Sequence, residues 1–161
     1  MDYPLYYSIK SQPPQPGLAE ILHCLKTHRN YIEEVRDTKN EKSRKIELVL
    51  KEDLGELGFT HSATNRNFPL FQENSLFEID FFNPRTGTAI EIERSNLYTK
   101  VWLALYKMLE SNLVKHGMIL VPIRRIVRNY PENSFELTYK RLRDNAHNLL
   151  QHLESLIVIG Y

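Results

Sequence analysis

LFEIDFFNPRTGTAIEIE, residues 76–93, is the stretch that decides how the chain folds. Its centre, NPRTG at 83–87, is a turn signal, because proline suits the second position of a type I turn and glycine takes a positive φ without steric cost. The arms on either side alternate polar and apolar residues, as strands with one buried face do. The stretch is therefore predicted to form a β-hairpin.

Four acids lie on the arms of this hairpin. A four-residue loop at 84–87 sets Asp80 opposite Glu91. The same register sets Glu78 opposite Glu93. Like charges directly across a strand pair destabilise it by roughly 0.2–1 kcal/mol. The stacked carboxylates therefore indicate a neutralising cation, and a hard divalent metal with oxygen ligands fits them. The alternative is a solvated sheet face on which all the acids meet water. The other face is predicted to pack on a core through Ile79, Phe81, Ile90 and Ile92.

The composition is that of an ordinary globular protein. With 161 residues, of which 42% are hydrophobic and 25% charged, the chain is expected to form one domain over 1–161. A single cysteine, Cys24, rules out an intrachain disulfide and fits a cytoplasmic location. No apolar run has bilayer length and no signal peptide is recognisable, so no membrane partner is expected. The formal charge of +1 means that nucleic-acid binding would depend on a local concentration of basic residues.

The rest of the chain is predicted from its apolar periodicity. Residues 1–17, rich in proline, form an extended arm that either packs on the domain or reaches a partner chain or DNA. The element order predicts an α/β fold, a mixed central sheet with helices on both faces. In order, the other expected elements are helices at 18–36 and 41–57, a loop or short irregular strand at 59–73, the hairpin, a helix at 97–113, a buried strand at 118–123, a loop, a helix at 135–154 and a short edge strand at 156–159.

The helix at 97–113 carries a wider apolar arc than one sheet face requires. Trp102, Tyr106 and Leu109 are among the residues that widen it. The excess indicates a second packing partner, which is either the terminal helix of the same chain or another copy of the protein. The second possibility predicts a homodimer.

Polar residues outside the hairpin are candidates to complete a site. Glu47 lies at the edge of the apolar stripe of the second helix, and Asp53 lies inside that stripe. Either acid could reach a site beneath the helix, although an edge acid is commonly just solvated. Arg124, Arg125 and Arg128 follow the buried strand, where they either contact phosphates or form a solvated rim.

An acid in the first hairpin strand, E-x-E in the second, then a helix and an apolar strand, resembles the PD-(D/E)XK nuclease superfamily. The similarity covers residues 77–122 and is greatest to type II restriction endonucleases of the BamHI and BglII kind, in which Glu or Gln replaces the usual lysine of the motif. Glu91-Ile92-Glu93 has that form here. Asn96 matches an Asn of the BglII-like branch, whereas Ser95 departs from the Gly that usually precedes it. The resemblance implies a restriction-endonuclease-like fold.

The resemblance also implies roles for individual residues. Asp80 and Glu91 would bind the metal, with the backbone carbonyl of Ile92 as a further ligand. Glu93 would be catalytic in the place of the lysine, and Glu47 is a looser match to a catalytic acid on a helix. The implied reaction is Mg²⁺-dependent hydrolysis of DNA phosphodiesters, with Mn²⁺ as a substitute ion, to 5′-phosphate and 3′-hydroxyl ends.

Replacing the lysine removes a positive charge from the site, so a greater dependence on metal is predicted. Lys100 is a candidate substitute cation, unless it is simply an exposed helix lysine. With Asn96, Arg124 and Arg125, it is also a predicted nucleic-acid contact. Two functions remain open: a restriction-type endonuclease that cuts double-stranded DNA as a homodimer, and a non-catalytic nucleic-acid-binding or assembly protein that keeps the nuclease fold.

Overall fold

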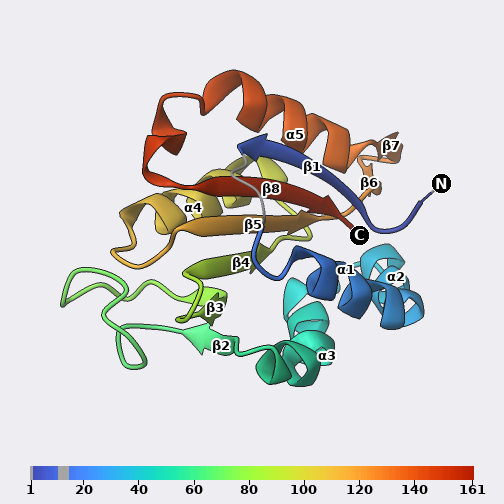
Figure 1. The fold of residues 1–161 in the computed structure, drawn as a ribbon. Coiled ribbons are helices and arrows are strands. Elements are labelled where there is room, and N and C mark those ends of the chain that lie inside the picture. Colours follow the sequence, from blue (N-terminus) through green and yellow to red (C-terminus); the bar gives the residue numbers. More distant parts are fainter. Residues whose placement is uncertain (1, 11–14) are drawn as a thin grey trace.

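A six-stranded mixed sheet forms the centre of the protein (Figure 1), which is described by a computed structural model at residues 2–10 and 15–161. The strand order is β1-β8-β5-β4-β3-β2. Strands β4, β5 and β8 are parallel to one another, and the remaining neighbours pair antiparallel. The strands are β1 (Leu5–Lys10), β2 (Thr60–Ala63), β3 (Ile79–Asn83), β4 (Thr88–Ile92), β5 (His116–Val121) and β8 (Ser155–Gly160). The predicted mixed α/β architecture is confirmed.

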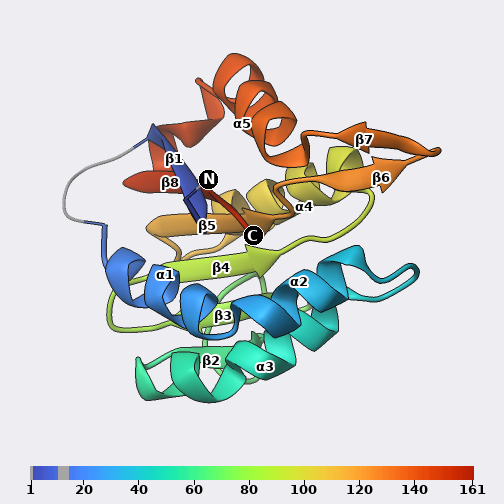
Figure 2. The same cartoon turned by 90° about the vertical axis from the view of Figure 1, so that its right-hand side faces the viewer.

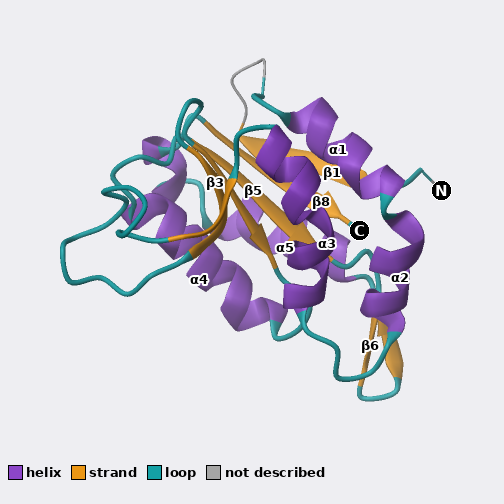
Figure 3. Cartoon of the chain, turned by 90° about the horizontal axis from the view of Figure 1, so that it is seen from below, coloured by secondary structure: helices purple, strands orange, loops and turns teal. Residues whose placement is uncertain are grey.

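Helices cover both faces of the sheet, and each face has its own hydrophobic core (Figures 2 and 3). On one face lie α1 (Leu18–Thr27), α2 (Arg29–Asp37) and α3 (Ser43–Glu56); on the other lie α4 (Leu97–Glu110), α5 (Ser134–Asn145) and the short 3-10 helix η1 (Leu149–His152). Because both faces are covered, every residue of β5 is buried, as predicted for the apolar run at 118–123.

The hairpin has the predicted register next to its turn, but the strand pairing ends at Phe81 and Ile90, before the predicted pairs of Asp80 with Glu91 and Glu78 with Glu93. Phe81 pairs with Ile90 and Asn83 pairs with Thr88, so residues 84–87 form the loop. Gly87 takes φ +70°, and its amide donates to the Asn83 carbonyl at 2.9 Å. The local turn chemistry therefore fixes which residues of β3 and β4 face each other.

One residue of the hairpin lies on a different face from the one predicted. Ile79 packs in the core beneath α4 and α5, whereas Phe81 packs in the opposite core with Ile90 and Ile92. The regular alternation fails beside Ser62 of β2, which has φ +54°. A residue in that conformation interrupts the pleat, so Ala63 and its partner Ile79 turn to the same core.

The N-terminal helical region is two helices and not one. α1 ends at His28, whose φ of −98° and ψ of +15° interrupt the helix before α2. The His28 Nε2 lies 2.8 Å from Asp53 Oδ2 on α3. Asp53 therefore holds the helix junction. The next helix, expected over 41–57, spans α3 and ends at Gly58 as predicted, with φ +96° and the paired backbone bonds of a Schellman motif.

Both ends of the chain differ from the predicted arrangement. The expected arm at 1–17 includes residues 1 and 11–14, which lie outside the described part of the chain. Within it, β1 packs on the domain by pairing with β8. The predicted edge strand at 156–159 is therefore an inner strand, because β1 takes the edge. The long helix expected over 135–154 ends early, since α5 stops at Asn145 and η1 follows.

Two short segments expected as loops contain strands. The region at 59–73, predicted as a loop or a short irregular strand, contains the short strand β2. The segment after β5 forms a separate two-stranded ribbon, β6 (Arg125–Val127) and β7 (Tyr130–Glu132). Neither apolar period nor length marks three-residue strands in a sequence, which is why the ribbon was not predicted.

The apolar arc of α4 is covered in part. Leu105 and Met108 lie in the same core as Leu142 of α5 and Leu150 of η1, so the end of the chain covers one side of the helix. Leu103, Tyr106 and Tyr98 of α4 remain exposed. Across residues 2–10 and 15–161, none of the helices combines the length and apolar character that crossing a bilayer requires.

Candidate active site

The hairpin and α3 bring their acids to one region of the sheet. Asp80 lies on β3, Glu91 on β4 and Glu93 directly after β4, while Glu47 approaches from α3. The Asp80 Oδ2 accepts a hydrogen bond of 2.8 Å from the backbone amide of Ile92. This bond fixes the Asp80 carboxylate against the backbone of the E-x-E segment.

Burial and mutual repulsion raise the pKa of three of these carboxyls. Burial raises the pKa of Asp80 from 3.8 to about 6, and the charge of Glu47 adds to the effect. Burial, followed by the charge of Asp80, raises the pKa of Glu93 from 4.5 to about 7. The same two causes raise the pKa of Glu91 well above its ordinary value. The acids therefore form one electrostatic unit that a cation would stabilise.

A lysine from α4 reaches the centre of this unit. Lys107 Nζ lies 2.7 Å from Glu91 Oε2 and donates a second bond of 2.7 Å to the Glu78 carbonyl oxygen. Glu91 is only 1% exposed. Its Oε1 is buried and has no hydrogen-bond partner among the described residues. The burial of Glu91 and the charge of Asp80 outweigh the ammonium, so the pKa of Glu91 is raised even in this pair.

Lys107 was not predicted, although the sequence carries a signal for it. The hairpin itself has no cation across from its acids, and the neutralising charge comes from another element. Lys107 lies between Ala104 and Met108, which are both fully buried residues of α4. A lysine beside the apolar stripe of a crossover helix is therefore placed to reach the sheet.

Glu47 is a buried acid held by two basic side chains. Arg44 Nη1 donates to Glu47 Oε2 at 2.9 Å, and His61 Nε2 lies 3.0 Å from the same oxygen. Arg44 also lies 3.7 Å from Glu78 Oε1, so it bridges the helix acid and the hairpin. The sequence gives a weak signal for Arg44, three residues before Glu47 on one helix, and none for His61.

The oxygen ligands fit a small divalent cation. Asp80, Glu91 and the Ile92 carbonyl offer hard ligands only, and the unpartnered Glu91 Oε1 is an orphaned acceptor. In residues 2–10 and 15–161, no three His, Cys, Asp or Glu side chains converge as a preformed cage. Mg²⁺ keeps several waters and needs one or two carboxylates, so this smaller set is compatible with it.

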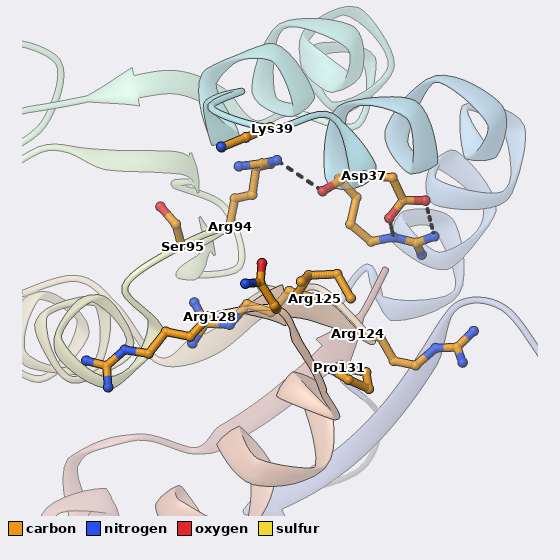
Figure 4. Close-up of a pocket in the computed structure, with 11 residues that line it drawn as sticks. Asp37, Lys39, Arg94, Ser95, Arg124, Arg125, Arg128 and Pro131 are labelled. Atoms are coloured by element: carbon orange, nitrogen blue, oxygen red, sulfur yellow. Dashed lines mark hydrogen bonds and ion pairs between the residues drawn. The ribbon is translucent and has the colours of Figure 1, made fainter.

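A basic cavity of about 690 Å³ lies between the end of α2 and the β6–β7 ribbon (Figure 4). Arg94 and Ser95, which line it, directly follow Glu93 in the chain. Among its lining residues, the one acid, Asp37, is paired with Arg36 at 2.8 Å. Six basic residues line the cavity: Arg36, Lys39, Arg94, Arg124, Arg125 and Arg128.

Two of the predicted nucleic-acid contacts, Arg124 and Arg125, line this cavity, and two do not. Asn96 and Lys100 are absent from its lining. Asn96 occupies the N-cap of α4 in a left-handed conformation, without a side-chain capping bond. Lys100 is exposed, and its charge acts to lower the pKa of Glu93. Lys100 therefore belongs to the acid cluster rather than to the cavity.

Arg94 ties the cavity wall to the sheet. Its guanidinium donates to the carbonyls of Val35 at 2.9 Å, Glu41 at 2.7 Å and Arg36 at 3.1 Å, and also to Thr38. These carbonyls belong to the end of α2 and to the connection that leads to α3. A forked cation is well suited to such a group of acceptors at a helix C-terminus.

The mixed sheet with helices on both faces is consistent with a restriction-endonuclease-like fold. A family model described as "Putative halobacteria restriction endonuclease" matches residues 3–161, and the chain belongs to this family. The family name supports a nuclease of restriction type. Comparison with curated proteins and with solved structures gives no match. The narrower likeness to BamHI and BglII stays a prediction.

Proposed function

We propose that the protein is a metal-dependent DNA endonuclease of type II restriction type, which hydrolyses phosphodiesters to 5′-phosphate and 3′-hydroxyl ends. The observation that carries the proposal is that Asp80 and the buried Glu91, whose Oε1 has no hydrogen-bond partner among the described residues, lie on neighbouring strands. Arg94, which directly follows the E-x-E segment, lines a cavity with five other basic residues. Membership of a family named for restriction endonucleases supports it.

The carboxylates of Asp80 and Glu91 and the Ile92 carbonyl would hold Mg²⁺, or Mn²⁺ in its place. When bound, such an ion supplies a hydroxide near neutral pH and stabilises charge on the scissile phosphate. The amide of Ile92 holds the Asp80 carboxylate in place. Glu93, whose pKa is raised to about 7, is matched to accept a proton from the attacking water.

The lysine and arginine side chains near the acids and in the cavity have different roles in this proposal. Lys107 holds Glu91 in position through the 2.7 Å contact. Arg44 does the same for Glu47. Lys100, which lies near Glu93, would counter the charge of the phosphate. Lys39 and Arg124 of the cavity would contact the DNA backbone.

A homodimer would let two sites cut the two strands of a duplex. The outer side of α4 is available for this contact, because Tyr98, Leu103 and Tyr106 are 67%, 41% and 53% exposed. Such large apolar groups on one helix favour a second copy as their partner. Sedimentation of Leu103→Lys, compared with the unchanged protein, tests the homodimer separately from cleavage. The variant should be monomeric if the dimer is formed through α4.

Plasmid cleavage tests the nuclease. Supercoiled DNA incubated with the protein and Mg²⁺ or Mn²⁺ is expected to be nicked and linearised, and the ends to be joined again by DNA ligase. Asp80→Asn and Glu91→Gln are expected to reduce the rate by at least about 100-fold, the scale of losing electrostatic stabilisation at a site. The matched control is Glu52→Gln, an exposed acid of α3. Equal cleavage by Asp80→Asn would contradict the proposal.

A second candidate is a non-catalytic DNA-binding or assembly protein that keeps the fold. The observation that favours it is the contact between Glu91 and Lys107, because an internal cation already compensates one of the proposed metal ligands. This candidate predicts duplex binding without cleavage at any concentration of either metal, and no stabilisation of the protein by Mn²⁺. Cleavage that depends on Asp80 excludes it.

A further inference from the structure

The β6–β7 ribbon is a projecting element that the acid cluster does not use. It extends away from the helices and the main sheet (Figures 2 and 3). Val127 pairs with Tyr130, so the turn between the strands is only two residues long. Those residues, Arg128 and Asn129, have φ of +50° and +68°, as a type I′ hairpin turn requires.

Arg128, one of the two residues at the tip of the ribbon, is not the residue that stability alone would favour there. Gly and Asn are the usual residues at positive φ, whereas an arginine there carries a conformational cost. Ile126 and Tyr130 beside the tip are 71% and 75% exposed. The ribbon therefore presents a basic tip and two large apolar side chains to the outside.

The root of the ribbon is held firmly. Arg125 Nε donates to Glu132 Oε1 at 2.8 Å, across the first pair of the ribbon. The Ser134 hydroxyl donates to the same oxygen at 2.9 Å and links the ribbon to the start of α5. Just before the ribbon, the amide of Ile123 donates to the Tyr161 carbonyl at 2.7 Å. The direction in which the tip points is thus fixed by the main sheet.

The ribbon forms one wall of the basic cavity, and the connection after α2 forms the other (Figure 4). Lys39 lies on that second wall, which Arg94 fastens to the end of β4. Glu93 of the acid cluster directly precedes Arg94 in the chain. Positive charge on both walls matches a polyanion that passes between them.

We infer that the β6–β7 ribbon enters the major groove of duplex DNA, where Arg128 and Asn129 contact base edges while Lys39 and Arg124 contact phosphates. This inference rests on the proposed function and adds the surface that selects the sequence. A major groove about 12 Å wide admits a two-stranded ribbon. Arginine pairs with guanine and asparagine with adenine through two hydrogen bonds each, so these tip residues can distinguish base pairs.

The test measures binding in a protein that need not cut. In the Asp80→Asn background, the probe is a pool of random-sequence DNA duplexes, and the bound fraction is sequenced. Replacing both tip residues by glycine, Arg128→Gly with Asn129→Gly, keeps the turn because glycine accepts positive φ. The double variant is expected to lose its preference at one or two base pairs. Its affinity for the preferred duplex should fall by about tenfold to a hundredfold.

Two further variants separate base reading from charge. Lys39→Gln is expected to weaken binding equally for all sequences and to lower the slope of log affinity against log salt by about one. Arg143→Gln removes the same charge from an exposed position near the far end of α5 and should leave both quantities unchanged. Equal effects of Arg143→Gln and the tip variant would overturn the inference.

The other outcomes are also decisive. Unchanged sequence preference in the glycine variant, or no preference in its parent, overturns the base-reading role of the tip. If Ile126→Ser with Tyr130→Ser converts a dimer to a monomer and leaves duplex affinity unchanged, the ribbon is a contact between copies and the inference is wrong. Failure of plasmid cleavage would refute the nuclease but leave these binding results valid, so the two proposals fail separately.

Discussion

The ammonium of Lys107 on α4 lies 2.7 Å from the carboxylate of Glu91 on β4, and these side chains are 12% and 1% exposed. The contact joins the crossover helix to the strand that carries the E-x-E segment. It places a positive charge in the acid cluster from outside the hairpin. The site is therefore less purely acidic than the hairpin sequence indicates.

Breaking this pair should be costly for the fold. Lys107→Met leaves Glu91 buried without its counterion, which typically destabilises a protein by about 3–5 kcal/mol. Adding Glu91→Gln should recover most of that loss, because the uncompensated charge is gone, but neither variant should cleave DNA. Urea denaturation and plasmid cleavage measure the two effects. Lys45→Met is the control, since its pair with Glu41 is on the surface, is screened by solvent and should contribute little. Equal losses for both lysines would contradict the buried-pair account.

The raised pKa of Asp80 makes the stability of the fold depend on pH. Its pKa is raised from 3.8 to about 6 in the folded protein, so folding favours the neutral carboxyl. The stabilising contribution is complete below about pH 4 and is lost as the pH rises through 6. Asp80→Asn has no carboxyl to ionise, so it does not lose this stability as the pH rises. Relative to the unchanged protein without metal, the variant should gain stability between pH 4 and 7.5, by about 3 kcal/mol for a shift of roughly two units at 1.36 kcal/mol each.

Urea denaturation at both pH values measures the stability of Asp80→Asn relative to the unchanged protein. Two controls accompany this measurement. Asp144 has the opposite shift, since Arg143 holds the pKa of this exposed carboxyl below its usual value. Asp144→Asn should therefore give no gain as the pH rises. Saturating Mn²⁺ should stabilise the unchanged protein and not Asp80→Asn, by about 2.7 kcal/mol at one hundred times the dissociation constant. A pH-independent difference for Asp80→Asn would refute the prediction.

Replacing Arg94 should lower the stability of the fold even when the replacement is lysine. Its guanidinium donates to four backbone carbonyls, two in the last turn of α2 and two in the connection to α3. Lysine keeps the charge but lacks the fork of donors, so Arg94→Lys should lose most of these bonds and cost about 2 kcal/mol or more. Arg143→Lys, which alters an exposed pair with Asp144, should cost little. The urea midpoints compare them, and full stability of Arg94→Lys would show that charge alone suffices.

The sequence was sufficient to predict the parts of the fold that local chemistry determines. The turn at 83–87 fixes the pairing of Phe81 with Ile90, because the loop length sets the register. The apolar run at 118–123 predicts a strand covered on both faces, since no other environment suits it. The same turn brings Asp80 and Glu91 onto adjacent strands, and their joint role in a metal site stays a prediction.

The missing parts depend on contacts between distant segments. β1 is a strand because β8 offers it an edge, and a proline-rich sequence does not reveal this partner. The break between α1 and α2 is held by the contact of His28 with Asp53, 25 residues away. Lys107 reaches Glu91 only because α4 packs over β4. Each of these features follows from tertiary packing, which periodicity and turn signals do not encode.

Replacing Tyr161 should change the pH dependence of cleavage, because Tyr161 contacts the backbone of Glu93. Its fully buried hydroxyl donates to the Glu93 carbonyl oxygen at 2.9 Å and so fixes the backbone that carries the acid. Tyr161→Phe removes one hydrogen bond and should cost about 1 kcal/mol of stability. With its backbone less restrained, Glu93 should become more solvated, so its pKa should fall from about 7 toward its ordinary value. At fixed Mg²⁺, the midpoint of the rise in cleavage rate with pH should therefore move to lower pH. Tyr6→Phe, which alters a half-exposed ring on β1, is the control and should leave the midpoint unchanged. A lower stability with an unmoved midpoint would mean that Tyr161 supports the fold but does not position Glu93.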